Sequence, residues 1–474
     1  MVALSRRDDP IIAIATAPGR GAVGVIRVSG RPLQSFVSAL CHQQLKPRTA
    51  HLLNLRDEHQ QHIDQVLALY FPSPHSYTGE DVLELQGHGG PVVLQMLLQH
   101  CLAVAKQLDP NGQIVLPQLR LAEPGEFTER AYLNQKMDLA QAEAVADLID
   151  ATTRAAAISA GRSLEGVFSQ KINALLDSLV QVRMQIEACI DFPEEDIEFI
   201  EKLQIKEQLK HLVLQVEQLL QEAEQGKLLR DGLKLVIAGQ PNAGKSSLLN
   251  ALSGADTAIV TDIEGTTRDV LSELIQIQGV PIHVLDTAGL RDSDQADPVE
   301  RIGIERAWQQ IEQADVVLLL NDLSRAQQTE FIHKQNRLME EIKRRVSAGT
   351  PVLQVDNKAD LLQQASNEHT QALVISAKTG SGIEKLRQTI LETAGWRQDQ
   401  AVGTFSARQR HVQALQQVMA HVATALELMQ LPTITIELLA EECRLAQNQL
   451  SQITGLYTTE DLLGEIFSRF CIGK

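Results

Sequence analysis

The chain is poor in aromatic residues, cysteines and positive charge for its size. Phe, Trp and Tyr make up 3% of its 474 residues, so a stacking platform for nucleic acid bases is not expected. Its five cysteines stand far apart without a Cys-x-x-Cys pair, which argues against a structural zinc site or a disulfide framework and fits a reducing cytoplasm. No apolar run reaches the roughly 18 residues of a membrane span.

The charge balance sets a further limit. The chain has 43 Lys and Arg against 60 Asp and Glu, which gives a net charge of −17. Such a chain does not attract nucleic acid through its overall field, so any RNA contact needs a local basic patch or a basic partner.

The composition changes along the chain and predicts several domains. The length suits about three domains of ~150 residues each. The first ~120 residues mix short strand-like runs, helical stretches and turn clusters, which is typical of an α+β domain. Residues 139–225 and those after 406 are helical in composition, and apolar residues such as Leu209, Leu212 and Val216 recur at helical spacing.

Residues 230–395 alternate apolar strand-like runs with helical stretches, the pattern of a mostly parallel sheet covered by helices. The simplest architecture inserts this α/β block into a single helical domain, because the two half-bundles can then bury each other's apolar stripes. A separate C-terminal helical domain is the alternative. The expected strands are residues 11–17, 24–28, 82–85, 233–238, 282–285, 316–320, 352–355 and 372–375, and the expected helices include 32–40 and 92–105.

A phosphate-binding loop follows the apolar run 233–238. Residues 239–246 read Gly-Gln-Pro-Asn-Ala-Gly-Lys-Ser, which matches the G-x-x-x-x-G-K-S loop in its strand-to-helix setting. The glycines let backbone N–H groups turn towards a phosphate, Lys245 adds a positive charge, and the Ser246 hydroxyl can ligate Mg²⁺.

The motifs that follow favour guanine over adenine. Residues 286–289, Asp-Thr-Ala-Gly, can hold the Mg²⁺ shell and meet the γ-phosphate, and the threonines of 266–267 lie where a switch threonine reaches the metal. Residues 357–360, Asn-Lys-Ala-Asp, bring Asp360, whose carboxylate can accept from the N1–H and 2-amino group of guanine. Residues 376–378 can support the base. Ligands of such sheets bind at these strand ends, so the order of the motifs predicts one GTP site.

The groups for hydrolysis are less usual. Many regulatory GTPases carry a water-orienting Gln directly after the Asp-x-x-Gly glycine, but here that position is Leu290. Either hydrolysis is slow or another group serves, and Glu300 can position the water. The positive charge of an arginine finger can come from a nearby Arg or from a monovalent cation beside Asn242. The nearby arginines are Arg268, Arg291 and Arg301.

The chain resembles the tRNA-modifying GTPase family called MnmE or TrmE over essentially its whole length. The resemblance rests on residues 18–21, 78–90 and 124–127, on Thr-Asp-Ile-Glu-Gly-Thr-Thr-Arg-Asp at 261–269, and on Phe-Cys-Ile-Gly-Lys at 470–474. It implies a cytoplasmic homodimer joined through the N-terminal domains and an FAD-binding partner subunit, known as MnmG or GidA, in a heterotetramer. Together the family's proteins modify carbon 5 of the wobble uridine of tRNA, adding an aminomethyl or carboxymethylaminomethyl group with a 5-formyl- or methylene-tetrahydrofolate carbon donor.

The fold class implied is multidomain, α/β and all-α. We expect an N-terminal α+β folate-binding and dimerisation domain at 1–125, a helical bundle domain at 126–228 and 397–474, and an inserted Ras-like P-loop GTPase domain with a mostly parallel sheet at 229–396.

The resemblance also implies the site residues. The catalytic residue would be Glu300, and the family's hydrolysis is activated by potassium, which pairs the GTPase domains across the dimer. Mg²⁺ would be held by Ser246 and Thr267, K⁺ by Asn242, Thr261, Ile263 and Thr266, and folate by Arg27, Glu84, Lys136 and Lys474. The GTP-binding residues would be Asn242, Ala243, Gly244, Lys245, Ser246, Ser247, Thr261, Asp262, Ile263, Glu264, Gly265, Thr266, Thr267, Asp286, Thr287, Ala288, Gly289, Asn357, Lys358, Ala359, Asp360, Ser376, Ala377 and Lys378.

Three other features invite a functional interpretation. Residues 19–24 match G-x-G-x-x-G, but the β-branched residues after them predict a tight turn between strands instead of the helix that a dinucleotide site needs. His88 stands among glycines without a second ligand at metal spacing, and we interpret it as a turn residue. Cys471 is either functionally important near the folate site, as the resemblance implies, or a small buried residue at a helix end.

Two alternative functions are kept open. The same GTPase block serves switch proteins that assist ribosome assembly, although these usually carry an RNA-binding appendage that this sequence does not reveal. A folate-binding module with a merely regulatory GTPase is the other alternative.

Overall fold

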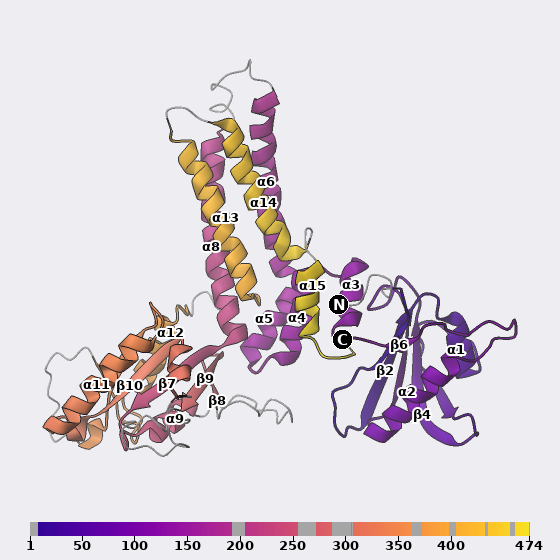
Figure 1. Cartoon of the computed structure of the whole chain (residues 1–474), viewed down its shortest axis with the longest axis horizontal. Helices are drawn as coiled ribbons and strands as arrows, with labels where there is room; N and C mark the ends of the chain where they lie inside the picture. Colours follow the sequence, from indigo (N-terminus) through magenta and orange to yellow (C-terminus); the bar gives the residue numbers. More distant parts are fainter. Residues whose placement is uncertain are drawn as a thin grey trace. The chain divides into compact units, whose positions relative to one another are not determined.

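The computed structural model describes residues 8–191, 204–254, 272–286, 305, 307–361, 372–397, 404–431, 435–455 and 460–473. The chain divides into two compact units, Met1–Ala146 with Ser451–Lys474, and Asp147–Leu450. Each unit is described by itself (Figure 1). Among the described residues, no helix has both the length and the apolar character that crossing a membrane requires.

The first unit is built on a six-stranded sheet. Its strands are β1 (Ile11–Ile14), β2 (Val23–Gly30), β3 (His51–Arg56), β4 (His62–Phe71), β5 (Asp81–His88) and β6 (Arg120–Leu121), in the order β3-β4-β5-β2-β1-β6. All neighbours are antiparallel except β1 and β6. Helices α1 (Gln34–Cys41) and α2 (Pro91–Ala105) lie along one face (Figure 1), and their apolar residues close a core with the strands.

The sequence predicts three of these strands and both helices. The G-x-G-x-x-G segment joins two strands as predicted, because β1 and β2 pair antiparallel on either side of it and no helix follows. The connection over residues 15–22 is longer than the tight turn that was expected, and the motif ends inside β2. The expected strand 11–17 is too long, since β1 ends at Ile14. Strands β3, β4 and β6 were not expected: Asn54 interrupts the apolar residues of β3, β6 has two residues, and the apolar run 66–71 of β4 was missed.

The end of the chain returns to the first unit. Helix α15 (Glu460–Ser468) packs on α3 (Glu126–Leu133), and the apolar residues Leu463, Phe467 and Phe470 form a small core with the start of α4 (Leu139–Asp150). Gly125 has a φ of +71°, and a Cβ there would lie 2.6 Å from the Phe467 carbonyl oxygen. Only glycine therefore allows the chain end to approach this closely.

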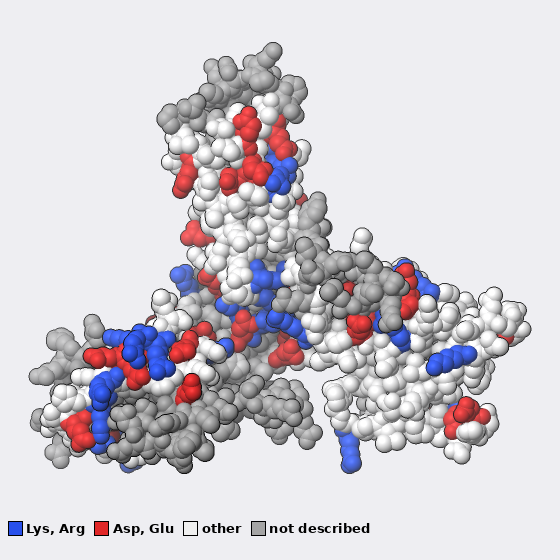
Figure 2. Space-filling model, viewed as in Figure 1, with Lys and Arg blue, Asp and Glu red and all other residues white. Residues whose placement is uncertain are grey.

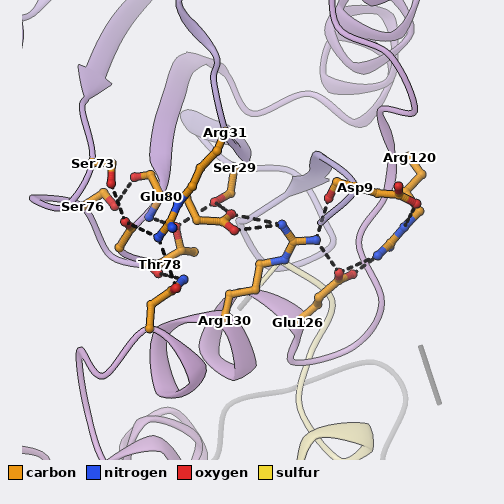
Figure 3. Close-up of polar contacts among 12 residues, drawn as sticks. Asp9, Ser29, Arg31, Ser73, Ser76, Thr78, Glu80, Arg120, Glu126 and Arg130 are labelled. Atoms are coloured by element: carbon orange, nitrogen blue, oxygen red, sulfur yellow. Dashed lines mark hydrogen bonds and ion pairs between the residues drawn. The ribbon is translucent and has the colours of Figure 1, made fainter. Parts of the chain in front are cut away.

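A buried ion-pair network joins α3 to the sheet (Figure 3). The Glu126 carboxylate accepts from Arg120 at 2.7 Å and from Arg130 at 2.8 Å, and Arg130 reaches Glu80 at 3.0 Å. Glu80 in turn accepts from the buried Ser29 hydroxyl at 2.7 Å. Because Glu126 and Arg130 are 2% and 4% exposed, each charge depends on its partners for compensation.

The second unit combines helices with an α/β block. Helices α5 (Arg154–Leu164), α6 (Val167–Asp191), α8 (Ile205–Asp231), α13 (Gln409–Leu428) and α14 (Ile436–Thr454) form the helical part, in which α8 packs on α6 and α13. The predicted stripe on α8 is buried at Leu209, Leu212, Val216 and Leu219. Helix α8 precedes the block and α13 follows it, and the two helices pack on each other. The helices on either side therefore form one domain with the α/β block inserted.

The α/β block has a six-stranded sheet in the order β12-β11-β10-β7-β9-β8, parallel except for the edge strand β8. Its strands are β7 (Leu233–Gly239), β8 (Ser272–Ile277), β9 (Val280–Asp286), β10 (Val316–Asp322), β11 (Val352–Asn357) and β12 (Leu373–Val374). Helices α9 (Lys245–Ser253) and α12 (Ile383–Thr393) contribute to one apolar core, and α11 (Thr329–Arg345) to another. Five of these six strands are predicted, and β8 is the exception.

A carboxylate holds the two chain crossings between the helices and the α/β block. Asp147, which is 8% exposed, accepts from Arg230 Nε at 2.8 Å, from the Ser406 hydroxyl at 2.8 Å and from the Arg408 guanidinium at 2.7 Å. Arg230 precedes the first strand of the block, and Ser406 and Arg408 follow its last helix. We call these four residues the Asp147 clasp.

Helix α8 also contacts the returning chain directly. The Gln225 side chain donates to the Gly395 carbonyl at 2.7 Å and accepts from the Arg397 N–H at 2.9 Å. At Gly226 a Cβ would lie 2.0 Å from the Phe405 carbonyl oxygen, so this close approach of two backbones requires glycine.

Candidate functional site

The phosphate loop connects β7 to α9. Asn242 and Gly244 have φ values of +65° and +97°, which turn the loop around a central space. The Lys245 ammonium lies across the loop, 3.0 Å from the Gly239 carbonyl oxygen. At Gly239, the last residue of β7, a Cβ would lie 2.8 Å from the Leu320 carbonyl oxygen, so only glycine fits where the loop begins. The loop thus presents its backbone and the start of α9 to an anion.

Asn357 joins three loops. Its Nδ2 donates to the Ala243 carbonyl at 2.9 Å, and its Oδ1 accepts from the Ala377 N–H at 3.0 Å. Asn357 is 2% exposed, so both bonds are made away from water. The phosphate loop, the 357–360 loop and the 376–378 loop are therefore held together by one side chain.

Asp360 is held ready to accept hydrogen bonds. The Ser376 hydroxyl donates to its Oδ1 at 2.6 Å, and Ser376 itself is 1% exposed. This hydrogen bond, helped by the charges of Lys378 and Lys358, lowers the pKa of the Asp360 carboxyl. Because Asp360 is exposed and ionised, its carboxylate can accept from a ligand with two neighbouring N–H donors, as guanine has.

The strand order explains why these loops meet. Gly239, Asp286, Asp322 and Asn357 are the last residues of β7, β9, β10 and β11, which are neighbours in the parallel part of the sheet. The carboxyl ends of parallel strands meet at one edge, which is where ligands of such sheets bind. The predicted convergence of the phosphate loop, residues 357–360 and residues 376–378 is therefore found.

Part of the predicted site lies outside the described residues. This holds for the proposed catalytic residue Glu300, for Leu290 and the three nearby arginines, and for all the predicted switch residues. The switch residues concerned are Thr261, Asp262, Ile263, Glu264, Gly265, Thr266, Thr267, Thr287, Ala288 and Gly289. Of the predicted metal ligands, Asn242 and Ser246 are described.

A second candidate site lies on the sheet of the first unit. Arg27 of β2 and Glu84 of β5 face each other across neighbouring strands, with Arg27 Nε 2.9 Å from Glu84 Oε1. The guanidinium carbon of Arg27 also lies 5.2 Å from the centre of the Tyr77 ring and 5.6 Å from that of Phe127. Two aromatic rings and a carboxylate thus orient a partly exposed guanidinium, an arrangement that suits a ligand with hydrogen-bond donors and an acidic group.

Of the two lysines predicted for this site, the structure describes Lys136 but not Lys474. The Lys136 ammonium donates to the Pro74 carbonyl at 3.1 Å, beside Gly79. Lys474 lies outside the described residues, but the preceding Gly473 contacts Ile14 and Ala15 at the end of β1. Since β1 pairs with β2, the chain end lies by the strand next to the one that carries Arg27.

Some of these features cannot be read from the sequence. Tyr77 and Phe127 were not predicted as walls around Arg27. The interpretation of His88 as a turn residue is wrong, because it is the last residue of β5, and its Nδ1 lies 2.7 Å from Oδ1 of Asp64, which is 5% exposed. Donors from His88 and Gln65 outweigh the effect of burial and lower the pKa of Asp64. The alternative that Cys471 is buried is wrong, since it is exposed, although Cys41, Cys101, Cys189 and Cys443 are buried.

Comparison with known proteins places the chain in a family. The model of the MnmE helical domain matches residues 139–471, and the model of the GTP-binding protein TrmE N-terminus matches residues 10–136. A tRNA modification GTPase MnmE of Acidovorax sp. (strain JS42) is 57% identical over 99% of this chain and 100% of its own length. The protein of the same name from Polaromonas sp. (strain JS666 / ATCC BAA-500) is 56% identical with the same coverage.

Among solved structures, the G domain of the T. maritima FeoB iron transporter is 25% identical, covers 34% of this chain and 98% of that chain, and has a TM-score of 0.27. Aquifex aeolicus Era bound to GDP.AlF4- is also 25% identical, covers 42% of this chain and 68% of that chain, and has the same TM-score of 0.27. A likeness at this level carries no functional information. The two family models and the full-length relatives do, and on their evidence the chain belongs to the MnmE family of tRNA modification GTPases.

Proposed function

We propose that this protein hydrolyses GTP as part of the modification of carbon 5 of the tRNA wobble uridine, together with an FAD-binding partner subunit. The observation that carries the GTP-binding part is the junction at Asn357, where the phosphate loop and both base loops meet. Family membership supports the tRNA part. Hydrolysis would gate the uridine chemistry by moving the GTPase domains.

The residues act on the nucleotide as follows. Asp360 accepts from the N1–H and the 2-amino group of guanine, while Ser376 keeps its carboxylate in place. Adenine lacks this pair of donors. With ATP bound, the Asp360 carboxylate would face the base without accepting these two hydrogen bonds, and this loss disfavours ATP. The amides of residues 242–247 and the Lys245 ammonium bind the phosphates. Bound Mg²⁺, held by Ser246 and Thr267, supplies positive charge to the phosphates.

Glu300 positions the attacking water, and K⁺ held by Asn242, Thr261, Ile263 and Thr266 supplies the positive charge of an arginine finger. This proposal is supported by the position of Asn242 at the turn of the phosphate loop. Its test compares hydrolysis in potassium with hydrolysis in sodium, where equal rates would contradict it. Glu300→Ala should lower turnover and leave nucleotide affinity unchanged; loss of GTP binding would show that Glu300 has another role.

A tetrahydrofolate derivative binds on the sheet of the first unit, at Arg27, Glu84, Lys136 and Lys474. The pterin ring offers donors to Glu84, and the acidic tail suits Arg27 and the lysines. The paired strands that carry Arg27 and Glu84 support this assignment. Calorimetry with 5-formyl-tetrahydrofolate tests it: Glu84→Gln should weaken binding by about tenfold or more, and unchanged affinity would contradict the assignment.

We propose that tRNA joins a cytoplasmic assembly built on a homodimer of this chain, and that it is contacted by a local basic patch or by the partner subunit, because the net charge of −17 disfavours binding through the overall field. The charge distribution supports this. On the face shown in Figure 2, Lys and Arg side chains are interspersed with Asp and Glu, and the basic residues of α11 are partly neutralised. Lys334 pairs with Glu330, and Arg345 with Glu341 and Glu312.

We also propose the domain boundaries 1–125, 126–228, 229–396 and 397–474.

The decisive experiment is nucleoside analysis of tRNA from a strain that lacks the protein. Loss of the modified wobble nucleoside, restored by the wild-type gene and poorly by Asp360→Asn, is the expected result. Normal nucleosides with a defect in ribosomal subunits would favour the ribosome-assembly alternative. Normal nucleosides without a ribosome defect would favour a folate-binding module with a regulatory GTPase.

A further inference from the structure

We propose that Asp322 is a positioning residue for guanine nucleotide binding, because it anchors the ammonium of Lys358 and thereby holds the lysine stem as an apolar support for the base. The proposal rests on the proposed function, since it requires that the base lies against the 357–360 loop. Asp322 belongs to none of the motifs that predict the GTP site.

The contacts of Asp322 give each oxygen its own partner. Oδ2 accepts from the Lys358 ammonium at 2.7 Å. Oδ1 accepts from the Ser324 N–H at 3.0 Å and from its hydroxyl at 2.6 Å. Asp322 ends β10 and is paired in register with Asn357, the last residue of β11. The carboxylate therefore lies beside the residue that joins the base loops to the phosphate loop.

Because Asp322 is buried, its carboxylate depends on the ion pair with Lys358. Asp322 is 2% exposed, and a carboxylate so far from water needs a cation or several donors. Burial acts to raise its pKa, but the hydrogen bonds from Lys358 and Ser324 outweigh burial and lower the pKa. Asp322 is thus charged at neutral pH and holds the ammonium of Lys358 at the end of β10.

Anchoring fixes the course of the Lys358 side chain. Its backbone has a φ of +68°, and it stands between Asn357 and the base-reading Asp360. With the ammonium bound at β10, the four-carbon stem must run from the 357–360 loop towards that strand, and 29% of the side chain stays exposed. The stem of a lysine packs well on flat apolar surfaces while its charge is satisfied elsewhere. A stem fixed before binding loses less rotamer entropy when the base arrives.

The experiment separates this role from the second contact of Asp322. Asp322→Asn keeps the size of the side chain and an oxygen for Ser324, but removes the charge that holds Lys358. Ser324→Ala is the matched control, because it removes the hydroxyl contact and leaves the ion pair intact. Lys358→Met keeps an unbranched stem without an ammonium, and the double variant Asp322→Asn/Lys358→Met tests whether the aspartate acts through the lysine.

Affinities for fluorescent GDP and GTP and steady-state hydrolysis are measured on the full chain. Asp322→Asn should weaken binding of both nucleotides by about tenfold and raise KM with little change in kcat, while Ser324→Ala stays within about twofold. The double variant should bind no more weakly than Lys358→Met alone. Independent, multiplying effects of the two substitutions, or wild-type affinity in Asp322→Asn, would overturn the proposal. A wild-type chain that bound no guanine nucleotide would overturn the proposed function instead, and this inference with it.

Discussion

Gly244 lies directly against Asn357 at the centre of the candidate GTP site. A Cβ at position 244 would be 2.5 Å from Nδ2 of Asn357, which is the atom that donates to the Ala243 carbonyl. Glycine is thus required at this loop position for two reasons, its φ of +97° and the close approach of a buried amide. The contact makes the fit of the phosphate loop and the fit of the base loops mutually dependent.

Gly244→Ala is therefore expected to abolish GTP binding, because the methyl group must displace the Asn357 amide. Gly349→Ala is the matched control, since Gly349 has nearly the same φ, +99°, and no atom lies within 4 Å of where its methyl group would stand. Both variants should lose about 1 kcal/mol of stability from backbone strain. Only Gly244→Ala should lose affinity in a fluorescent-nucleotide titration, and equal affinities would refute the role of the contact.

Asn357→Ala should lower GTP affinity by about tenfold or more. It leaves the Ala243 carbonyl and the Ala377 N–H without their partner, which costs about 1–3 kcal/mol for each buried group that water cannot reach. Calorimetry of nucleotide binding measures the loss, and urea unfolding measures the cost to stability. Asn336→Ala on the exposed surface of α11 is the control and should match the wild type in both measurements.

Gly226→Ala should destabilise the second unit even though alanine favours helices. The new methyl would overlap the Phe405 carbonyl oxygen, and overpacking of this kind costs about 1–3 kcal/mol or more. Gly161→Ala on α5 is the opposite case, because nothing lies within 4 Å of its Cβ position. It should stabilise by about 0.5–1 kcal/mol. Chemical unfolding of both variants checks the pair, and a stable Gly226→Ala protein would contradict the close approach.

The network around Glu126 predicts a pH dependence of the first unit. Burial acts to raise the pKa of Glu126, but hydrogen bonds from Arg120, the Glu123 N–H and Arg130 outweigh it and lower the pKa. A carboxyl whose pKa is lowered on folding stabilises the fold above its unfolded value, ~4.3, and this contribution is lost as the pH falls through the folded value.

Glu126→Gln should cost about 3–5 kcal/mol at pH 7, because it leaves the buried Arg130 with less compensation. Its stability should also fall less than that of the wild type between about pH 6 and pH 3. Urea unfolding across this range is the measurement. Glu123→Gln, at an exposed neighbouring position, is the control. Parallel pH profiles for Glu126→Gln and the wild type would show that the carboxylate does not titrate as argued.

Local sequence signals predicted the parts of the fold whose pattern lies within one segment. The run Val316–Leu320 reads as a buried parallel strand because every residue is apolar, and β10 is such a strand. The antiparallel β3 escapes this reading, since Asn54 faces away from the core and breaks its apolar run, whereas the run 66–71 of β4 carries a signal that was missed. Their pairing is a long-range property that a single segment does not carry.

The same distinction holds at the site. The phosphate loop and Asp360 are found because their chemistry needs fixed spacing along the chain. Asp322 lies 36 residues before its partner Lys358, and Asp64 lies 24 residues before His88, so no spacing rule connects them. Whether a carboxylate meets a cation is decided by which strands become neighbours, and the sheet order supplies that information only after folding.

The Asp147 clasp has a consequence for how the chain could have acquired its α/β block. The segment that leads into the α/β block and the segment that follows it both bind Asp147. The ends of the block are therefore close together, and the helices can pack in the same way whether or not the block is present. A variant in which residues 232–403 are replaced by a short flexible linker should still fold into the helical domain. Insertions are tolerated where the two ends of the inserted segment lie close together. A domain inserted in this way keeps its own apolar core and is joined to the helical domain at both of its ends.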